Sequence, residues 1–248
     1  RAAAELGCDV LFSANAFRRK GRFVMPGPAL DGLRGRACLD SAGFVAMHRY
    51  GGYPWSPSEY LDLVAAYPWR WYAAMDLCCE PELGAEVNER IARTVSNLVD
   101  LRALAASRGL PMPMPVLQGW APEDYARCVR LMGEAIGDWL DLVGVGSMCR
   151  RHMEGEHGLR AVVRALDAAL PAHVRLHLFG VKSTALGELS HHPRVASSDS
   201  MAWDFAARMD ARARGVSSTM RLRARSMGRW LRTQKRHVNG GAWQMELI

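Results

Sequence analysis

The fold class is decided by the stretch ACLDSAGF (Ala37–Phe44), in which a short apolar run ends on a carboxylate and small residues follow. Further apolar runs along the chain also end on a polar residue or a glycine. The residues at or just beyond these run ends are Asp40, Asp76, Gln118, Ser147, Gly180 and Asp199. Because the C-terminal ends of the strands in a (β/α)8 barrel converge on one face, we expect these residues to meet in one pocket. The sequence therefore predicts an enzyme.

Seven candidate strands alternate with segments that have the apolar spacing of helices. The strands are expected at Asp9–Ser13, Ala37–Asp40, Arg70–Met75, Met114–Gln118, Leu142–Gly146, Val174–Phe179 and Arg194–Ser197. The helices are expected at Pro57–Tyr67, Glu86–Ser107, Pro122–Gly137, Gly158–Leu170, Thr184–Ser190, Met201–Ala213 and Thr219–Arg236. This alternation predicts an α/β fold with a parallel sheet, and its seven repeats favour a TIM-barrel-like (β/α)8 fold over an open sheet.

A barrel needs one strand more than these seven. That strand lies either before Arg1 or in the tail Ala242–Ile248, and a chain that begins with Arg instead of Met suggests a start inside a longer one. We predict a barrel that lacks its first strand over residues 1–213 and a basic helical extension over residues 214–248.

Basic residues concentrate near the C-terminus. The chain has a formal net charge of +7, yet the segment Arg208–His237 alone holds ten Lys and Arg against one Asp. The rest of the chain is therefore slightly acidic, and a basic face on such a body fits a polyanionic partner such as nucleic acid. A solvated Arg-rich helix is the alternative. The arginines expected to contact nucleic acid are Arg221, Arg223, Arg225 and Arg229.

Composition excludes several classes of protein. Hydrophobic residues make up 49% and charged residues 23%, which is ordinary for a globular domain and excludes disorder. No apolar run approaches the roughly 18 residues of a membrane span, and no secretory signal opens the chain. Six cysteines without compact spacing indicate reduced thiols, so a cytoplasmic location is expected.

The strand-end residues suit the recognition of a planar heterocycle. Small residues after Asp40 let a flat ligand approach the backbone, although the same Asp could instead cap the next turn. The amide of Gln118 presents a donor and an acceptor in one plane. Cys78 and Cys79 could bind a metal together with Cys149, but adjacent cysteines rarely give tetrahedral geometry, so no metal and no cofactor are expected.

Taken in order, these motifs resemble the tRNA-guanine transglycosylase superfamily over nearly the whole chain. The family's Asp-Ser-Gly-Gly-Phe is similar to DSAGF (40–44), and its Asp two residues before a Cys is similar to DLC (76–78). Its Gln-Gly-Gly resembles QGW (118–120), and its Gly-Gly-Leu resembles GVG (144–146) more loosely. Its Met-Gly-Val-Gly looks like FGVK (179–182), and its nucleophilic Asp falls on Asp199.

Two departures point to one branch of the superfamily. The enzymes that act on tRNA carry a zinc site of three cysteines and a histidine after the nucleophile, whereas no cysteine follows Cys149 here. Their Pro-Thr-Arg after the nucleophile is replaced by MAWD (201–204). The chain is more similar to the DpdA-like proteins, which the resemblance implies are pentosyltransferases that place a 7-deazaguanine base, such as preQ0, in DNA. Partners implied are DNA, the 7-deazaguanine base and other DNA-modification proteins, with no membrane.

The resemblance also implies a role for each site residue. Asp199 is expected to attack the sugar as nucleophile, and Asp40 is expected to protonate the departing guanine and then deprotonate the incoming base. Asp76 and Gln118 are expected to hold the purine edge, and Phe44 or Phe179 to stack on its ring. The remaining substrate-binding residues are expected to be the glycines Gly144, Gly146 and Gly180.

Other functions stay open at this point. The family resemblance also allows base exchange in tRNA, which the absent zinc cysteines disfavour. A noncatalytic barrel that binds nucleic acid through its basic tail would need neither Asp40 nor Asp199. An unrelated (β/α)8 hydrolase would not require Asp76 and Gln118 to bind the edge of a purine.

Overall fold

The computed structural model describes residues 2–84, 86–149, 151–237 and 244–247. It is a mixed α/β protein whose main sheet is parallel and has the strand order β4-β1-β9-β8-β7-β6-β5. The strands are β1 (Asp9–Ser13), β4 (Ala37–Asp40), β5 (Val116–Leu117), β6 (Leu142–Val145), β7 (Arg175–Leu178), β8 (Val195–Ser200) and β9 (Gln244–Leu247). Because all of them run the same way, their C-terminal ends lie on the same side of the sheet.

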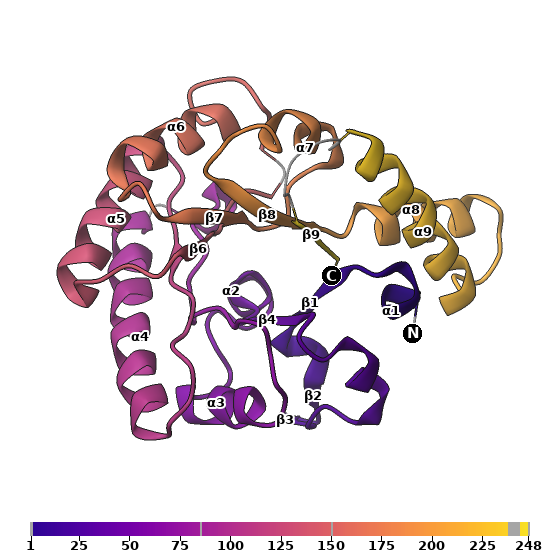
Figure 1. The fold of residues 1–248 in the computed structure, drawn as a ribbon, viewed down its shortest axis with the longest axis horizontal. Helices are drawn as coiled ribbons and strands as arrows, with labels where there is room; N and C mark the ends of the chain where they lie inside the picture. Colours follow the sequence, from indigo (N-terminus) through magenta and orange to yellow (C-terminus); the bar gives the residue numbers. More distant parts are fainter. Residues whose placement is uncertain (1, 85, 150, 238–243, 248) are drawn as a thin grey trace.

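Most helices lie around the outside of the strands, whereas α2 (Gly43–Tyr50) lies near the middle of the view (Figure 1). The helices are α1 (Ala2–Leu6), α2, α3 (Pro57–Ala65), α4 (Val87–Ser107), α5 (Pro122–Ile136), α6 (Leu159–Ala169), α7 (Ser183–Leu189), α8 (Ala202–Ala213) and α9 (Met220–His237). Their apolar sides and the strands enclose the main hydrophobic core, which includes Leu39, Leu98, Tyr125, Val143 and Leu176. The seven helices expected from periodicity are all present, with ends shifted by no more than two residues.

Two helix starts show why the sequence folds as it does locally. Ser56 and Glu59 form a capping box at the start of α3, with Ser56 Oγ accepting from the Glu59 amide at 3.2 Å. At the start of α5, the carboxylate of Asp124 accepts from the Ala121 amide at 2.8 Å and from the Trp120 amide at 3.1 Å. These caps satisfy amides that a helix leaves unpaired, and the second one also holds the turn that follows Gln118.

The expected strand Arg70–Met75 is present only as isolated bridges. Leu39 pairs with Tyr72, and Ala73 pairs with Met114, both in the parallel sense. Backbone hydrogen bonds nevertheless follow the segment, from the Leu39 amide to Trp71 O at 3.1 Å and from the Ala74 amide to Met114 O at 2.9 Å. The two edge strands β4 and β5 are thus linked through this segment.

The tail forms the strand between β8 and β1. Asp199 of β8 pairs with Glu246, and Val10 of β1 pairs with Leu247. Of the two positions expected for the missing strand, before Arg1 or in the tail, the described residues thus show a strand in the tail. This is feasible because α9 packs against α1, which directly precedes β1, so the chain returns beside β1 before it enters the sheet.

Some elements have no counterpart among the expected ones. Helix α2 follows Asp40 directly, and its N-terminal neighbour Ala42 adopts a left-handed backbone with φ of 68°. A short antiparallel hairpin joins β2 (Arg18–Arg19) and β3 (Arg22–Phe23), and α1 precedes β1. Short 3-10 helices lie at Ala14–Phe17, Pro28–Leu33 and Pro81–Leu83.

Candidate active site

A cavity of about 730 Å³ opens at the C-terminal ends of the strands. It brings together residues from the segments that follow β4, β5, β6, β7 and β8, as the parallel topology requires. The predicted site residues that line it are Asp40, Phe44, Asp76, Gln118, Gly146, Phe179, Gly180 and Asp199. Ser147, the remaining strand-end residue, lines it too. The residues at five strand ends and Asp76, which follows the bridged segment 70–74, therefore meet in one pocket, as the sequence predicts.

Asp199 lies in the floor of this cavity near the end of β8, with 1% of its surface exposed. Its Oδ1 atom accepts a hydrogen bond from the Gly180 amide at 3.0 Å. Its Oδ2 atom is buried and has no hydrogen-bond partner among the described residues. A buried carboxylate oxygen without a donor is costly unless a ligand or water contacts it. The orientation of Asp199 thus leaves one oxygen available to a molecule in the cavity.

His177 is a site residue for which the sequence motifs predicted no role. Its Nε2 atom lies 3.3 Å from Asp199 Oδ1, and its Nδ1 atom lies 2.7 Å from Ser197 Oγ. At Nδ1 the ring shares a hydrogen bond with the Ser197 hydroxyl, and its Nε2 atom faces the Asp199 carboxylate. The ring is fully buried between Trp71 and Phe179, with centroid distances of 5.0 and 4.6 Å. The signal in the sequence was a histidine between two leucines of a strand.

Asp40 lines the same cavity from the end of β4, where its side chain is half-buried. Burial raises the pKa of its carboxyl group to about 8, and the negative charges of Asp76 and Asp199 act in the same direction. A hydrogen bond from the Ala42 amide opposes this shift. Asp40 is therefore mostly protonated at neutral pH, which is the state required of a group that donates a proton.

A hydrogen-bond network covers another side of the floor. The Asp76 carboxylate accepts from Ser41 Oγ at 2.8 Å and from the amide nitrogen of Gln118. Ser147 Oγ contacts Gln118 Oε1 at 2.8 Å and Glu80 Oε2 at 3.0 Å. Burial raises the pKa of Asp76, while its hydrogen bonds oppose that shift. The network holds one carboxylate and one amide in place at the edge of the cavity.

The loop after α2 is anchored to this network. Tyr53 donates a hydrogen bond to the carbonyl oxygen of Asp76 at 2.9 Å and lies 2.8 Å from Ser41 Oγ. These contacts join the loop YGGYP (50–54) to the floor of the cavity, as expected for a fixed connector. Tyr53, Ser41 and Glu80 are further site residues that the sequence motifs did not single out.

Gly43 and Gly146 leave space for the hydrogen-bond network, whereas Gly144 lies below the floor of the cavity. A Cβ atom on Gly146 would lie 2.0 Å from the amide nitrogen of Gln118, and one on Gly43 would lie 2.5 Å from the carbonyl oxygen of Asp76. Gly144 does not line the cavity, contrary to its expected role in substrate binding. It lies two residues earlier on the same face of β6, where a Cβ atom would meet the Phe179 ring at 2.5 Å. Because side chains alternate along a strand, Gly144 packs one layer below the cavity floor.

No metal site is formed by the part of the chain that the structure describes, in which no three His, Cys, Asp or Glu side chains are grouped to bind one. Cys78 and Cys149 line the cavity, and Cys79 is buried behind it. The expectation that the protein needs no metal stays a prediction. Across the same described residues, no helix has the length and apolar character that crossing a membrane requires.

Comparison with known proteins bears on this cavity. A model of the DpdA family, whose description is DeoxyPurine in DNA protein A, matches residues 13–245. The chain belongs to the DpdA family. All residues that line the carboxylate-rich cavity lie within the matched range, so this cavity is part of the family's common domain. No curated protein matches the sequence.

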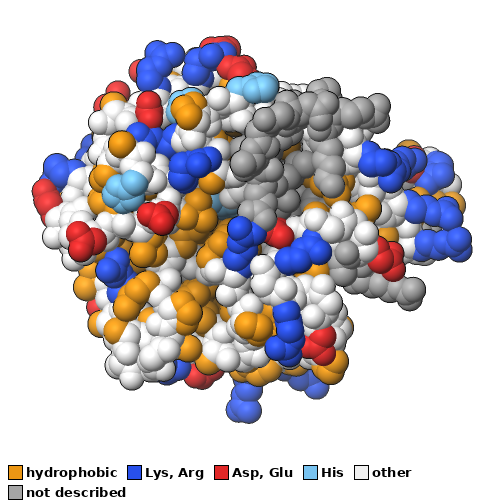
Figure 2. Space-filling view, viewed as in Figure 1, with side chains coloured by type: hydrophobic (Ala, Val, Ile, Leu, Met, Phe, Trp, Pro, Cys, Tyr) orange, Lys and Arg blue, Asp and Glu red, His pale blue; other side chains and the backbone are white. Residues whose placement is uncertain are grey.

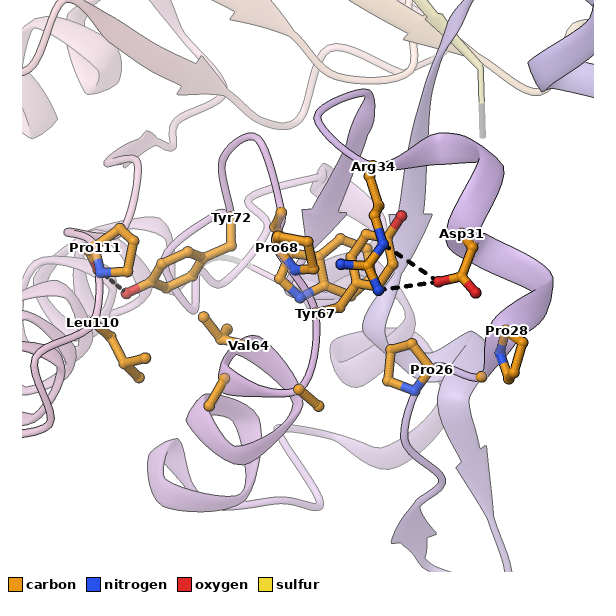
Figure 3. A pocket seen from close by; sticks show the side chains of 14 residues that line it. Pro26, Pro28, Asp31, Arg34, Val64, Tyr67, Pro68, Tyr72, Leu110 and Pro111 are labelled. Atoms are coloured by element: carbon orange, nitrogen blue, oxygen red, sulfur yellow. Dashed lines mark hydrogen bonds and ion pairs between the residues drawn. The ribbon is translucent and has the colours of Figure 1, made fainter.

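A second cavity of this DpdA family member lies near the opposite ends of the strands and has a volume of about 650 Å³. Proline and aromatic side chains line it, and the residues come mainly from segments that precede β4, Tyr72 and β5 (Figure 3). Its hydroxyl groups are paired with backbone oxygens, Tyr67 with Leu30 at 2.7 Å and Tyr72 with Pro111 at 2.5 Å. At its rim, Arg34 and Asp31 form an exposed ion pair at 3.1 Å.

The basic segment Arg208–His237 of the DpdA chain includes the end of α8 and the whole of α9, and α9 packs on α8, α7 and α1. Lys and Arg side chains gather on the α8–α9 side of the molecule (Figure 2). Arg221, Arg225 and Arg229 line a groove of about 520 Å³ beside α1, together with Arg232. Arg223 instead contacts the buried carboxylate of Asp204, which also binds Arg208 at 2.9 Å. Its predicted role in nucleic-acid contact therefore competes with a structural ion pair.

Proposed function

We propose that this protein is a base-exchange transglycosylase that replaces guanine in DNA with a 7-deazaguanine base of the preQ0 type. Membership of the DpdA family supports a DNA-modifying guanine transglycosylase. The observation that carries the proposal is the buried Asp199 Oδ2 atom without a partner among the described residues, in one cavity with an Asp40 whose pKa is about 8. One carboxylate is thus available for attack while the other holds a proton, as a double displacement needs.

In the first half of the reaction, Asp199 Oδ2 attacks C1′ of the target nucleotide as the C1′–N9 bond breaks. The electron pair of that bond goes to the purine, and the Asp40 proton is transferred to it as guanine departs. The product is an ester between Asp199 and the sugar. The Gly180 amide binds Oδ1 of the same carboxylate, and His177 Nε2 lies 3.3 Å from that oxygen, so Oδ2 is the oxygen proposed to attack the sugar.

In the second half, a 7-deazaguanine base occupies the position that guanine left. Asp40, now ionised, takes the proton from N9 of this base, and N9 attacks C1′. The ester bond breaks, and its electron pair returns to Asp199 as a free carboxylate. Two inversions at C1′ give net retention, so the modified nucleotide keeps the configuration of DNA.

Asp76 and Gln118 have the chemistry to select a guanine-like edge. The N1–H and N2–H groups of such a base are donors that a carboxylate accepts, and O6 is an acceptor that the amide nitrogen of Gln118 can serve. The Asp76–Gln118 hydrogen bond already places the two groups side by side. Phe179 lines the same cavity and offers a ring face for stacking.

The test is an exchange assay on DNA that carries labelled guanine, with a 7-deazaguanine base as second substrate. Release of label that depends on the added base supports the proposal, and isolation of a protein–DNA adduct that Asp199→Asn abolishes supports the covalent step. Label release without incorporation of the base would instead indicate a hydrolase. Exchange in tRNA but not in DNA would favour the sibling activity.

DNA binding through α9 is part of the same proposal. Arg221, Arg225 and Arg229 are exposed along one groove, which suits a phosphate backbone. The triple variant with glutamine at these positions should weaken DNA binding and reduce the salt slope by roughly one for each phosphate that is no longer bound. Replacing Arg223 should instead destabilise the protein because Asp204 would be left buried without that partner.

For the fold, we propose that the parallel strands, β9 included, and the segment 70–74 close into an eight-stranded (β/α)8 barrel. Of the expected basic extension 214–248, the helix α9 then lies beside the barrel, whereas β9 belongs to it. Support comes from the backbone hydrogen bonds of Leu39, Ala74 and Met114, which link β4 to β5. Slow hydrogen exchange at Ala73 and Ala74, comparable with that in β7, is expected for a closed barrel. Fast exchange there would indicate an open sheet.

A further inference from the structure

Two rings stand at the rim of the catalytic cavity. Phe44 is 38% exposed and lies in the first turn of α2, and Phe205 is 62% exposed and lies in the first turn of α8. Phe44 packs against His48 with a centroid distance of 4.1 Å. Phe205 is the more exposed of the two. Single exposed apolar side chains are common on protein surfaces, and what distinguishes this ring is its place at the edge of the cavity.

The surroundings of Phe205 carry positive charge. Arg212 follows it at helical spacing on an exposed position of α8, and Lys182 is an exposed residue of the same cavity rim. Arg208 is also exposed on α8, where it pairs with the buried Asp204. The acidic groups lie deeper, at Asp40, Asp76, Glu80 and Asp199. A rim that combines a ring with cations, above an acidic floor, matches a nucleic-acid strand whose phosphates stay outside while one base enters.

The depth of the reactive groups imposes a conformation on the substrate. Asp199 is almost fully buried, so a purine stacked inside a duplex cannot reach it, and the target nucleotide has to leave the helix. Extrusion leaves a gap in the base stack and exposes the faces of the neighbouring bases. Proteins that unstack DNA commonly fill such gaps with an apolar side chain.

We propose that Phe205 stacks on the base next to the extruded nucleotide and occupies the gap in the DNA stack. The inference rests on the proposed function, because it takes the cavity as the place where the target purine reacts. The position of Phe205 supports it, since α8 begins two residues after Ser200 at the end of β8 and carries the ring to the outer edge of the same cavity as Asp199. Phe205 is thus a binding residue, while the carboxylates carry the chemistry.

The experiment compares the protein with Phe205→Ala, Phe205→Tyr and Phe205→Trp on a duplex that contains the target guanine. Base–aromatic stacking predicts that the alanine variant loses roughly ten-fold in DNA affinity and in kcat/KM, while the aromatic variants stay near the parent. The single-turnover rate at saturating DNA should change by less than about three-fold, since no reacting group is altered. Val99→Ala, which removes an exposed apolar side chain from the outer surface of α4, is the matched control.

A second readout reports stacking directly. A duplex with 2-aminopurine beside the target guanine should be brighter in complex with Phe205→Ala than with the parent, because ring stacking quenches this base. Equal affinity and equal fluorescence in parent and alanine variant, with the melting temperature unchanged, would overturn the inference. Failure of the parent to exchange bases would instead defeat the proposed function, and the binding and fluorescence measurements would still decide on Phe205.

Discussion

The two cavities at opposite ends of the strands are nearly equal in volume, about 730 and 650 Å³, yet they differ in chemistry. The C-terminal cavity contains four acidic side chains, one with a buried carboxylate oxygen that has no partner among the described residues. The cavity at the other end is lined by prolines and rings, and its tyrosine hydroxyls are bonded to backbone oxygens. The two cavities thus differ in their buried polar groups and not in their volume, and this difference makes the C-terminal cavity the candidate active site.

The difference follows from strand direction. Side chains that end parallel strands project from several elements toward one point, so a few substitutions can gather charged groups there. At the other end the chain enters the strands through turns such as Tyr67–Trp69, where proline and aromatic packing stabilises the connection. If this contrast holds, substitutions at the first cavity change activity and those at the second change stability.

The largest effect is expected for Asp199→Asn. Loss of the nucleophile should reduce base exchange by ~10⁴-fold or more, as for other enzymes whose nucleophile is removed. The melting temperature should stay the same or rise, because a buried carboxylate is replaced by a neutral amide. Tyr67→Phe in the second cavity is the control and should exchange bases at the parental rate. Comparable losses in both variants would contradict the contrast between the cavities.

Asp40→Asn should reduce guanine release by roughly 10²–10⁴-fold because the leaving base loses its proton donor. In the parent, release should decline above about pH 8, where Asp40 loses its proton, and this decline should be absent from the residual activity of the variant. A parental rate that stays level from about pH 7 to 9.5 would exclude Asp40 as the acid.

The pH dependence of protein stability should report on the same Asp40 carboxyl group. Folded Asp40 keeps its proton up to about pH 8, whereas the unfolded chain loses it near 3.8, so its contribution is full below 3.8 and lost as the pH rises to 8. Asp40→Asn should therefore melt above the parent at pH 8, by roughly 2–4 °C per kcal/mol gained. The gap should narrow toward about pH 4, and a gap that widens on acidification would contradict the raised pKa.

Gly144 in β6 and Gly146 directly after it test which layer of residues forms the cavity. Gly146→Ala should displace Gln118 and raise the KM for the 7-deazaguanine base roughly ten-fold, the effect of removing one hydrogen bond from a charged network. Gly144→Ala should instead press on Phe179 and lower stability, by about 1–3 kcal/mol for overpacking. Steady-state kinetics and chemical denaturation of both variants separate the two effects. If both variants changed KM and stability in the same way, both glycines would lie in the same layer.

The smallest effects are expected where only packing or backbone strain changes. Tyr72→Phe should lower the free energy of unfolding by about 1 kcal/mol, since Pro111 loses its hydrogen-bond donor, and should leave base exchange intact. A loss of exchange in this variant would give the second cavity a role in function.

Ala42→Gly, beside the C-terminal cavity, is expected to increase the stability of the protein. Ala42 holds a left-handed backbone at the start of α2, and glycine should relieve at most about 1 kcal/mol of strain. Urea denaturation checks the gain, and a less stable variant would show that the alanine methyl contributes more in the core than its backbone costs.

Much of the site was predictable because it depends on strand direction alone. Once strands and helices alternate, all strand ends fall on one side, so Asp40, Asp76, Gln118 and Asp199 had to lie near one another wherever the exact ends were. Helical periodicity and caps such as Ser56–Glu59 are local, and the sequence determined these helices to within two residues.

Tertiary structure decided what depends on contacts between distant segments. The pairing of the tail with β1 and β8 is set by where α9 returns the chain, and no local pattern records that path. The contact between His177 and Asp199 joins neighbouring strands across a register shift, so spacing in the sequence could not show it.

Gly144 and Gly146 look alike as a motif, yet side-chain layers place only one at the cavity. Arg223 looks like its neighbours on α9, but a buried carboxylate from α8 binds it. Local propensity acts over a few residues, whereas burial and charge pairing are settled only when the whole chain has folded.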